Sequence, residues 1–449
     1  MNNSWYYKSI FYHIYPLGFC GAPLNNDFNS KPVARLKKIE EWIPYLKSLG
    51  INTLYLGPIF ESSTHGYDTA DYFSIDRRLG TNSTLKHLVD KLHKNGIRIV
   101  LDGVFNHVGR NFPNFLDLIK NKASSPFVSW FAGINFNNKS PYNDDFSYET
   151  WHGCYDLVKL NVQNQDVKNF IFNVIKFWMD EFKIDGIRFD AADCIDINFL
   201  KEISSFCKNI NPDFFLLGEV IFGDYARFAN KDTLDSVTNY ECYKGLHSSH
   251  NSLNYFEIAY SLNRQFGDGG IYKNLPLYNF VDNHDVNRIA STLTDKDNLY
   301  PIYTLLFTMP GIPSIYYGSD FGVTGVKENN SDKALRPELN LSELMSSGNL
   351  KLNNLIKSLS KIRSKSEALT LGNYKQLFIS NKQFAFLRYT DNEKIVTALN
   401  CSKESVEINF STDFSSSITD LINEEYIKVT NNRLNIPLPP NGARIFKVN

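Results

Sequence analysis

The sequence has few cysteines and no long apolar run, and these absences exclude several classes of protein. Its six cysteines are scattered through 449 residues without a CxxC pair or metal-like spacing, which argues against a disulfide framework. No window approaches the length of a membrane-spanning helix. The amino-terminal residues lack a basic region followed by a long apolar run, so we expect no secretory signal. These absences predict a cytoplasmic protein with free thiols.

The sequence also lacks net charge. The formal charge is −1 and the sequence pI is about 6.8, so we expect no bulk attraction to nucleic acid or to an anionic membrane. The hydrophobic share of 43% and charged share of 21% are typical of a soluble globular protein. A chain of 449 residues predicts two or three domains.

Apolar segments of strand and helix type alternate along most of the chain. Strands are expected over residues 9–19, 51–59, 97–104, 184–193, 214–220, 235–240, 277–281 and 312–317, and helices over 33–49, 83–95, 166–182 and 352–363. Near-continuous apolar strands separated by helices predict parallel strands covered by helices. Eight such strands predict a (β/α)₈ barrel, the α/β class of fold.

Two parts of the sequence depart from this alternation. Residues 106–164 are rich in aromatic residues, Asn, Ser and Pro, and a long irregular excursion inside a regular fold is usually functional. Residues 374–448 alternate apolar and polar with turn residues, which predicts a small antiparallel β domain. We therefore expect a barrel over 1–105 and 165–368, an inserted domain over 106–164, and a carboxyl-terminal β-sandwich over 369–449.

The stretch Ile184–Asp193 (IDGIRFDAAD) carries charged residues at the end of an apolar strand. Arg188 and Asp190 are two residues apart, so on a strand they project from the same face. A guanidinium beside a carboxylate keeps that carboxylate ionised and oriented, as a nucleophile requires. A purely structural Arg–Asp pair at a strand terminus explains this stretch equally well.

Polar residues follow several other predicted strands. They are His65, Tyr67 and Asp68 after the second strand, Asp102, Asn106 and His107 at the third, Glu219 at the fifth, and Asn283, His284 and Asp285 at the seventh. Barrel enzymes keep their sites at the carboxyl ends of the strands, so we expect these side chains to converge. Each alone has a structural explanation, and their convergence is what favours a catalytic site.

Three carboxylates suit the cleavage of a glycosidic bond with retention. In that scheme Asp190 attacks the anomeric carbon, and Glu219 protonates the leaving oxygen and later activates water. The apolar setting of Glu219 (FLLGEV) favours the protonated carboxyl group that a general acid needs. Asp285 would bind sugar hydroxyls and help distort the ring.

The chain resembles the α-amylase family, glycoside hydrolase family 13, through short motifs spread over nearly its whole length. The motifs are Asp102–His107 (DGVFNH), Gly186–Asp190 (GIRFD), Gly218–Val220 (GEV), Phe280–Asp285 (FVDNHD), His65–Tyr67 (HGY) and Lys159–Asn161 (KLN), the last in the form seen in neopullulanase and cyclomaltodextrinase-like enzymes. The resemblance implies that Asp190 is the nucleophile, Glu219 the acid/base and Asp285 the transition-state stabiliser.

The resemblance also implies roles for supporting residues. Those expected to bind substrate are His65, Tyr67, Asp102, His107, Arg188, His284, Asp332 and Arg336, with Tyr67 stacking on the sugar in the −1 subsite and the last two gripping the −2 sugar. Asn106 and Asn161 match positions that bind calcium in the family. Asp193 and Cys194 stand where many secreted α-amylases carry a Lys-His pair that contributes a calcium contact. We therefore expect no required cofactor.

The leading hypothesis is an intracellular hydrolase of short α-1,4-linked glucans, with cyclodextrins or pullulan as further substrates. An α-glucanotransferase working through the same glycosyl-enzyme is the main alternative, and a preference for α-1,6 bonds or an α-glucosidase activity is also open. A non-catalytic amylase-like binding module is disfavoured because all three carboxylates are present. The expected partner is an α-glucan oligosaccharide. The sequence begins almost directly at the first strand, so the amino-terminal β domain of neopullulanase-like enzymes is not expected, and the oligomeric state is left open.

Overall fold

The computed structural model describes residues 4–328, 331–414 and 417–449. Contacts divide the chain into two compact units, which we describe separately. Unit 1 comprises Met1–His13, Tyr45–Asn52 and Thr238–Asn449, and unit 2 comprises Ile14–Pro44 and Thr53–Val237. Asp190 and Glu219 therefore belong to unit 2, and Asp285 belongs to unit 1.

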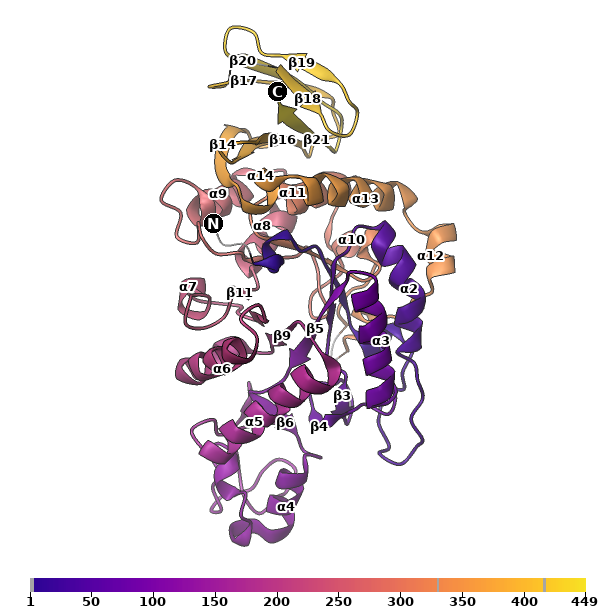
Figure 1. Cartoon of the computed structure of the whole chain (residues 1–449), viewed down its shortest axis with the longest axis vertical. Coiled ribbons are helices and arrows are strands. Elements are labelled where there is room, and N and C mark those ends of the chain that lie inside the picture. The colour runs from indigo at the N-terminus through magenta and orange to yellow at the C-terminus, as the bar shows by residue number, and fades with distance from the viewer. Residues whose placement is uncertain (1–3, 329–330, 415–416) are drawn as a thin grey trace. The chain divides into compact units, whose positions relative to one another are not determined.

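Eight strands form one sheet in the order β11-β10-β9-β5-β2-β1-β13-β12 (Figure 1). They are β1 (Phe11–Ile14), β2 (Thr53–Leu56), β5 (Arg98–Gly103), β9 (Gly186–Phe189), β10 (Phe215–Gly218), β11 (Ser236–Val237), β12 (Tyr278–Asn279) and β13 (Ile312–Tyr316). The pairs within each unit are parallel. The predicted (β/α)₈ barrel is confirmed, although all eight strands are shorter than the apolar runs that predicted them.

Four of the helices that alternate with these strands, α2, α3, α5 and α13, lie at the predicted places, and the others were not predicted individually. In unit 2 the helices are α1 (Pro16–Phe19), α3 (Asn82–Lys94), α5 (Gln165–Phe177), α6 (Ile197–Ile210) and α7 (Tyr225–Phe228), and α2 (Lys37–Ser48) begins there. In unit 1 they are α8 (Tyr240–Asn251), α9 (Phe256–Phe266), α10 (Ile289–Thr292), α11 (Leu299–Thr308), α12 (Leu341–Ser347), α13 (Leu350–Lys365) and α14 (Glu367–Leu371). No helix in the described ranges combines the length and apolar character needed to cross a membrane.

Helix α5 begins at a side-chain cap and ends in a wider turn. Asn164 caps the helix, because its side-chain oxygen accepts the N–H of Asp166 at 2.8 Å. The helix then widens into a π-helical turn, Trp178–Phe182. The indole N–H of Trp178 donates to the carbonyl of Tyr72 at 2.8 Å, and its ring stacks on Phe60 with centroids 4.2 Å apart. The π turn therefore places a large buried ring under the strands.

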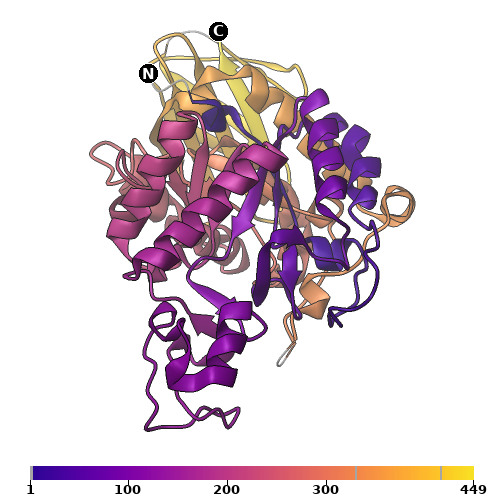
Figure 2. The same ribbon diagram turned by 60° about the horizontal axis from the view of Figure 1, so that its bottom comes forward.

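The inserted segment is more regular than its sequence suggested. It contains a three-stranded sheet in the order β6-β8-β7, made of β6 (His107–Gly109), β7 (Thr150–Trp151) and β8 (Cys154–Lys159), together with α4 (Pro113–Asn121). Figure 2 shows this purple segment extending away from the magenta helices α5 and α6 of the same unit. The sequence indicated an irregular excursion because strands whose partners lie as far apart as His107 and Lys159 leave no local periodic pattern.

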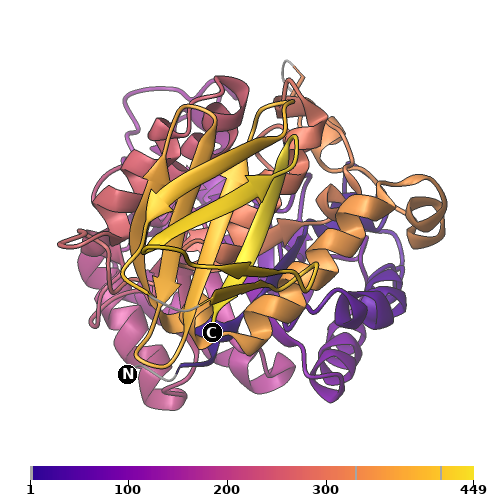
Figure 3. The same ribbon diagram turned by 90° about the horizontal axis from the view of Figure 1, so that it is seen from above.

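The carboxyl-terminal part of unit 1 is an antiparallel β structure, as predicted. Figure 3 looks onto its main sheet. That sheet has the order β14-β15-β16-β21-β18-β19, and β17 pairs with β20 separately. The strands are β14 (Asn373–Ile379), β15 (Gln383–Tyr389), β16 (Lys394–Asn400), β17 (Val406–Ser411), β18 (Ser417–Asp420), β19 (Tyr426–Lys428), β20 (Arg433–Leu438) and β21 (Gly442–Val448). Apolar side chains from both sheets share one buried core, which includes Leu387, Phe410, Ile436 and Phe446.

Candidate active site

Three adjacent strands of unit 2 bring Asp102, Arg188, Asp190 and Glu219 to one edge of the sheet. Asp102 in β5 is the cross-strand neighbour of Arg188 in β9. The N–H of Asp190 donates to the carbonyl of Gly103 at 3.1 Å, and the N–H of Glu219 donates to the carbonyl of Phe189 at 2.9 Å. The backbone ladder therefore continues one residue beyond β9 and β10. Hydrogen bonds of the sheet therefore fix the backbone of Asp190 and of Glu219.

One guanidinium joins the three carboxylates of unit 2. Arg188 donates from Nη1 to Asp102 Oδ1 and to Asp190 Oδ1, each at 2.8 Å, and its Nη2 lies 2.8 Å from Glu219 Oε2. All four side chains are buried. Burial alone would lower the pKa of Arg188, but Asp102 and Glu219 raise it well above its usual range. Arg188 is therefore a permanent positive charge, and the carboxylates are fixed around it.

The cluster carries more potential negative charge than one guanidinium can balance. Burial raises the pKa of Asp190 well above its usual range; Arg188 opposes that rise, while Glu219 and Asp102 add to it. Three carboxylates this close repel one another when all of them are ionised. The cluster therefore retains a proton to a higher pH than isolated carboxyl groups would. A site with one ionised and one protonated carboxyl group is what a nucleophile and a general acid together require.

Two tyrosines orient the third carboxylate. The hydroxyl of Tyr55 donates to Asp102 Oδ2 at 2.7 Å, and that of Tyr67 donates to the same oxygen at 3.3 Å. Since the other oxygen of Asp102 accepts from Arg188, both sides of this carboxylate are occupied by donors. Asp102 therefore holds Arg188 and Tyr67 in position. Because donors occupy both of its oxygens, Asp102 is not available to attack a substrate.

His107 is a neutral donor beside the proposed nucleophile. Burial, and then nearby His65, lower the pKa of His107 to about 3, so the ring is uncharged at neutral pH. The side-chain amide of Asn106 donates to its Nδ1 at 3.2 Å, which leaves the proton on Nε2. Nε2 lies 3.9 Å from Asp190 Oδ2 and has no hydrogen-bond partner among the described residues. A sugar hydroxyl placed near Asp190 would find a donor there.

Replacing Arg188 with Met tests whether the guanidinium holds the cluster together. Removing one partner of a buried ion pair costs about 3–5 kcal/mol, so we expect a loss of that size in the free energy of unfolding at pH 8. At pH 5 the carboxylates take up protons more easily, and the loss shrinks. Denaturant unfolding of wild type and variant at both pH values measures it, and equal losses would contradict the account.

Arg264→Met is the matched control for that measurement. Arg264 pairs with Glu241 at the surface of unit 1, where 39% of the arginine side chain is exposed. An exposed ion pair contributes only about 0–1 kcal/mol. The control should therefore show a small loss at pH 8.

Unit 1 contains four of the predicted site residues: His284, Asp285, Asp332 and Arg336. Arg336 Nη2 bonds Asp285 Oδ1 at 2.9 Å and Asp332 Oδ2 at 3.0 Å, and its Nε donates to the carbonyl of His284 at 3.0 Å. His284 Nε2 lies 2.9 Å from Asp285 Oδ2. The side chain of Asp285 is 37% exposed, whereas that of His284 is buried. Asp285 is thus held by Arg336 and His284 while it stays accessible.

His65 and Tyr67 lie in a loop between two short strands, β3 (Phe60–Ser62) and β4 (Thr69–Ile75), and not at the end of a barrel strand. The N–H of Tyr67 donates to His65 Nδ1 at 3.2 Å, and the carbonyl of His65 accepts the hydroxyl of Tyr15 at 2.7 Å. Tyr67 reaches the Arg188 cluster through its hydroxyl group. The side chain of His65 remains 40% exposed.

The side-chain amides of Asn106 and Asn161, the two residues that match calcium positions of the family, contact other groups of the protein. The amide of Asn161 is used within the protein: its Nδ2 donates to the carbonyl of Ser129 at 2.9 Å, and its Oδ1 accepts the N–H of Gln163 at 3.2 Å. The amide nitrogen of Asn106 faces His107. Calcium prefers six to eight oxygen ligands that include carboxylates. Within the described ranges no group of three or more His, Cys, Asp or Glu side chains could hold a metal ion.

Two site residues escaped the sequence analysis. Tyr55 lies in the apolar strand β2, and only its cross-strand position beside β5 shows that its hydroxyl reaches Asp102. Ala191 follows Asp190 and adopts a left-handed backbone with φ 45°. That conformation is strained for a non-glycine residue, and it directs the Ala191 N–H to Glu219 Oε2 at 3.2 Å. Neither contact has a local sequence signal.

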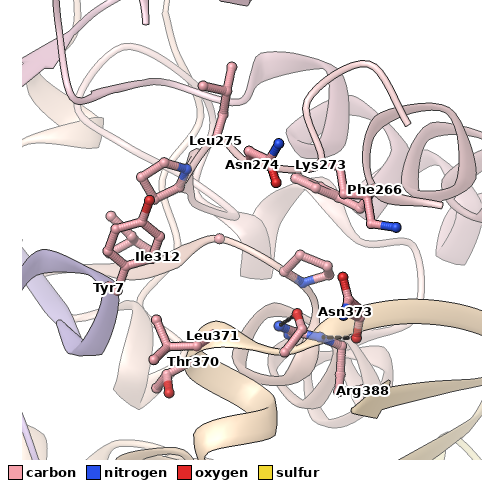
Figure 4. A pocket seen from close by; sticks show the side chains of 14 residues that line it. Tyr7, Phe266, Lys273, Asn274, Leu275, Ile312, Thr370, Leu371, Asn373 and Arg388 are labelled. Carbon is pink, nitrogen blue, oxygen red and sulfur yellow. Dashed lines mark hydrogen bonds between the residues drawn. The ribbon is translucent and has the colours of Figure 1, made fainter. Parts of the chain in front are cut away.

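A pocket of about 350 Å³ in unit 1 contains none of the predicted site residues (Figure 4). It is lined by Tyr7, Phe266, Asn274 and Arg388, among others. The guanidinium of Arg388 donates hydrogen bonds to backbone carbonyls, including that of Gly372 at 2.9 Å. It therefore satisfies carbonyl groups of the chain segments around it. The pocket offers no carboxylate pair, so it does not have the chemistry of the Asp190 cluster.

Comparison with known proteins identifies the family. The sequence model described as Alpha amylase, catalytic domain, matches residues 14–367. The chain belongs to the α-amylase family. A second model, described as Maltogenic Amylase, C-terminal domain, matches residues 374–445. This α-amylase-family enzyme is therefore a glycoside hydrolase whose two matched regions follow the barrel and the carboxyl-terminal β structure.

The named relatives of this α-amylase-family enzyme include a cyclomaltodextrinase and a maltogenic amylase. It is 30% identical to a cyclomaltodextrinase of Bacillus sp over 423 residues, which cover 89% of this chain and 74% of that protein. It is 31% identical to an intracellular maltogenic amylase of Bacillus subtilis (strain 168) over 338 residues, 72% of this chain and 56% of that protein. Among solved structures, a cyclic α-maltosyl-(1→6)-maltose hydrolase from Arthrobacter globiformis aligns with TM-score 0.84 and 26% identity, covering 99% of this chain and all of that one.

Proposed function

We propose that this enzyme hydrolyses α-1,4-glucosidic bonds in short maltooligosaccharides with retention of configuration, through a covalent glycosyl-enzyme. The observation that carries the proposal is the buried pair of Asp190 and Glu219 on adjacent strand ends, held by Arg188. The names of the relatives support maltodextrins and cyclodextrins as the substrate class.

In the first step Asp190 Oδ attacks the anomeric carbon and the bond to the leaving oxygen breaks. Glu219 gives its proton to that oxygen, so the leaving sugar departs as an alcohol. In the second step the ionised Glu219 takes a proton from water, and the resulting hydroxide displaces Asp190 from the anomeric carbon. Arg188 stabilises the carboxylate that is ionised at each stage, because it contacts both.

The remaining residues bind and orient the sugar in this proposal. The Nε2–H of His107 donates to a sugar hydroxyl without adding charge, since its ring is neutral. Asp285, fixed by Arg336, accepts from sugar hydroxyls and stabilises the positive charge that develops on the ring. Asp332 shares that arginine and contributes to binding of a further sugar.

A product profile tests the proposed function. Wild-type enzyme is incubated with maltotriose, maltoheptaose, β-cyclodextrin, pullulan and panose, and the products are separated at early times. Maltose and glucose from the linear substrates are expected. Products longer than their substrates would identify a glucanotransferase instead, and failure to cleave every one of these glucans would overturn the proposal.

We propose further that calcium is not needed. The side-chain amides of Asn106 and Asn161 are engaged with the protein, whereas calcium prefers six to eight oxygen ligands that include carboxylates. Treatment with EDTA followed by gel filtration should leave kcat on maltotriose within about 20% of that of the untreated enzyme, and the thermal midpoint within about 1 °C, the shift that a loss of about 1 kcal/mol would cause in a chain of this length. A loss restored by added Ca²⁺ would contradict this.

We infer that the enzyme works in the cytoplasm. The intracellular maltogenic amylase of Bacillus subtilis is a relative that supports this location. Fractionation of the source cells should release the activity only on lysis, and activity in the culture medium of intact cells would contradict the inference.

A further inference from the structure

Two hydrogen bonds of opposite direction link the loop after β9 to the loop after β10. The N–H of Ala191 donates to Glu219 Oε2 at 3.2 Å. The N–H of Ile221 donates back to Asp193 Oδ2 at 3.3 Å. Each loop therefore supplies a backbone donor to a carboxylate of the other. The first bond holds the proposed acid/base directly, and the second holds the backbone two residues after it.

Asp193 is well placed to anchor this backbone. It lies in the 3-10 turn Ala192–Cys194, which directly follows the left-handed residue Ala191. Burial, and then the charge of Asp193, raise the pKa of Cys194 to about 11, so the thiol keeps its proton and donates to Asp193. The carboxylate thus has one donor from its own turn and one from the opposite loop.

The loop after Glu219 has little packing to hold it beyond Ile221. Phe222 is 81% exposed. A Cβ atom added at Gly223, where φ is +100°, would meet nothing within 4 Å. A segment with an exposed ring and open space around its backbone gains little order from apolar contacts. The bond from Ile221 to Asp193 is therefore placed where the loop begins to lose contact with the rest of unit 2.

We propose that Asp193 is a positioning residue for Glu219, acting through the backbone N–H of Ile221. The inference rests on the proposed function, because it concerns the delivery of a proton to the leaving oxygen. Proton transfer requires donor and acceptor within hydrogen-bond reach, and a displacement of about 1 Å can reduce the rate about 10²-fold. Arg188 and Ala191 fix the carboxylate of Glu219, and Asp193 fixes the chain that carries it.

A purely structural role and a positioning role predict different substrate dependence. A misplaced general acid slows only substrates whose leaving oxygen needs a proton. In α-maltosyl fluoride the leaving fluoride departs without one, while Asp190 forms the same bond to the anomeric carbon. The value of kcat/KM for the fluoride reports the steps up to cleavage of the carbon–fluorine bond, so it is insensitive to the later activation of water by Glu219.

The experiment compares kcat/KM for maltotriose and for α-maltosyl fluoride in wild type, Asp193→Ala and Asp193→Asn. If the general acid is displaced, we expect Asp193→Ala to lower kcat/KM for maltotriose by about 10-fold to 10²-fold. Its kcat/KM for the fluoride should stay within about twofold of the wild-type value. Asp193→Asn keeps an oxygen acceptor for the Ile221 N–H and should recover to within about threefold of wild type on maltotriose.

Glu202→Ala is the matched control for loss of a carboxylate nearby. Glu202 is on α6, where it pairs with Lys168 at 2.6 Å and its side chain is 43% exposed. It should leave both kcat/KM values unchanged. Thermal midpoints of all variants, and the fluoride reaction itself, show that Asp193→Ala is folded.

Equal losses of Asp193→Ala on both substrates would assign it a structural role and overturn the proposal, as would no loss on either. A failure of Asp193→Asn to recover activity would also contradict a role through the Ile221 hydrogen bond. Wild-type enzyme that cleaves α-maltosyl fluoride but no α-glucan would overturn the proposed function itself, and the two failures are therefore distinguishable.

Discussion

Asp190→Asn should lower kcat on maltotriose by about 10⁴-fold or more, since removal of a catalytic nucleophile has effects of this size. The amide has nearly the shape of the carboxylate but cannot form the ester to the anomeric carbon. It can still accept from Arg188, which bonds Asp190 Oδ1 at 2.8 Å, so the cluster should remain assembled. The measurement is initial rate by reducing-sugar release, with the thermal midpoint checked in parallel.

Asp196→Asn is the matched control for this substitution. Asp196 caps α6 by accepting the N–H groups of Asn198 and Phe199, and Asn is an equally good cap. The same chemical change six residues further along the chain should therefore leave kcat within about twofold, as for surface changes that preserve a cap. Residual activity of Asp190→Asn above about a tenth of wild type would remove Asp190 from the role of nucleophile, because no such variant retains a tenth of its rate by binding alone.

Glu219→Gln should have the second largest effect, and its size should depend on the leaving group. General acid–base catalysis contributes about 10²–10⁴-fold, so kcat/KM on maltotriose should fall by that range. On α-maltosyl fluoride kcat/KM should fall much less, because fluoride leaves without a proton. Arg188 Nη2 and the Ala191 N–H both approach Glu219 Oε2, and the glutamine oxygen can still accept from them.

The second half of the reaction gives Glu219→Gln a further signature. With α-maltosyl fluoride the variant should form the glycosyl-enzyme and then stall, since no base activates water. A burst of fluoride followed by a slow steady state is expected, and azide should speed the slow phase because this anion attacks without needing a base. Equal losses on both substrates, with no burst, would show that Glu219 is not the acid/base.

The site residues at the strand ends could be predicted from sequence, because each follows a run of apolar residues that is recognisable locally. Asp190 follows β9 and Glu219 follows β10 in the structure, as the apolar runs around them indicated. The sequence also placed the barrel and the carboxyl-terminal β structure, whose periodicities are strong. It could not give the lengths of the strands, because side-chain burial extends beyond the residues that pair.

Apart from the Arg188–Asp190 pair, the contacts that organise the site were not predictable, because they depend on register. Arg188 reaches Asp102 only because β5 and β9 align those two residues. The pairing of Ile221 with Asp193 joins backbone to side chain across 28 positions and depends on the left-handed turn at Ala191. Similarly, the inserted segment contains paired strands whose partners lie far apart in the chain. Such geometry is set by tertiary structure and leaves no periodic trace in the sequence.

Identification of the residue that carries the sugar tests the central claim most directly. Glu219→Gln is mixed with α-maltosyl fluoride, quenched in acid, digested with pepsin and analysed by tandem mass spectrometry. The account predicts one maltosyl group, attached through an ester to Asp190 in the peptide that contains residues 186–193. A maltosyl group on any other side chain, or release of product with inverted anomeric configuration and no labelled peptide, would contradict it.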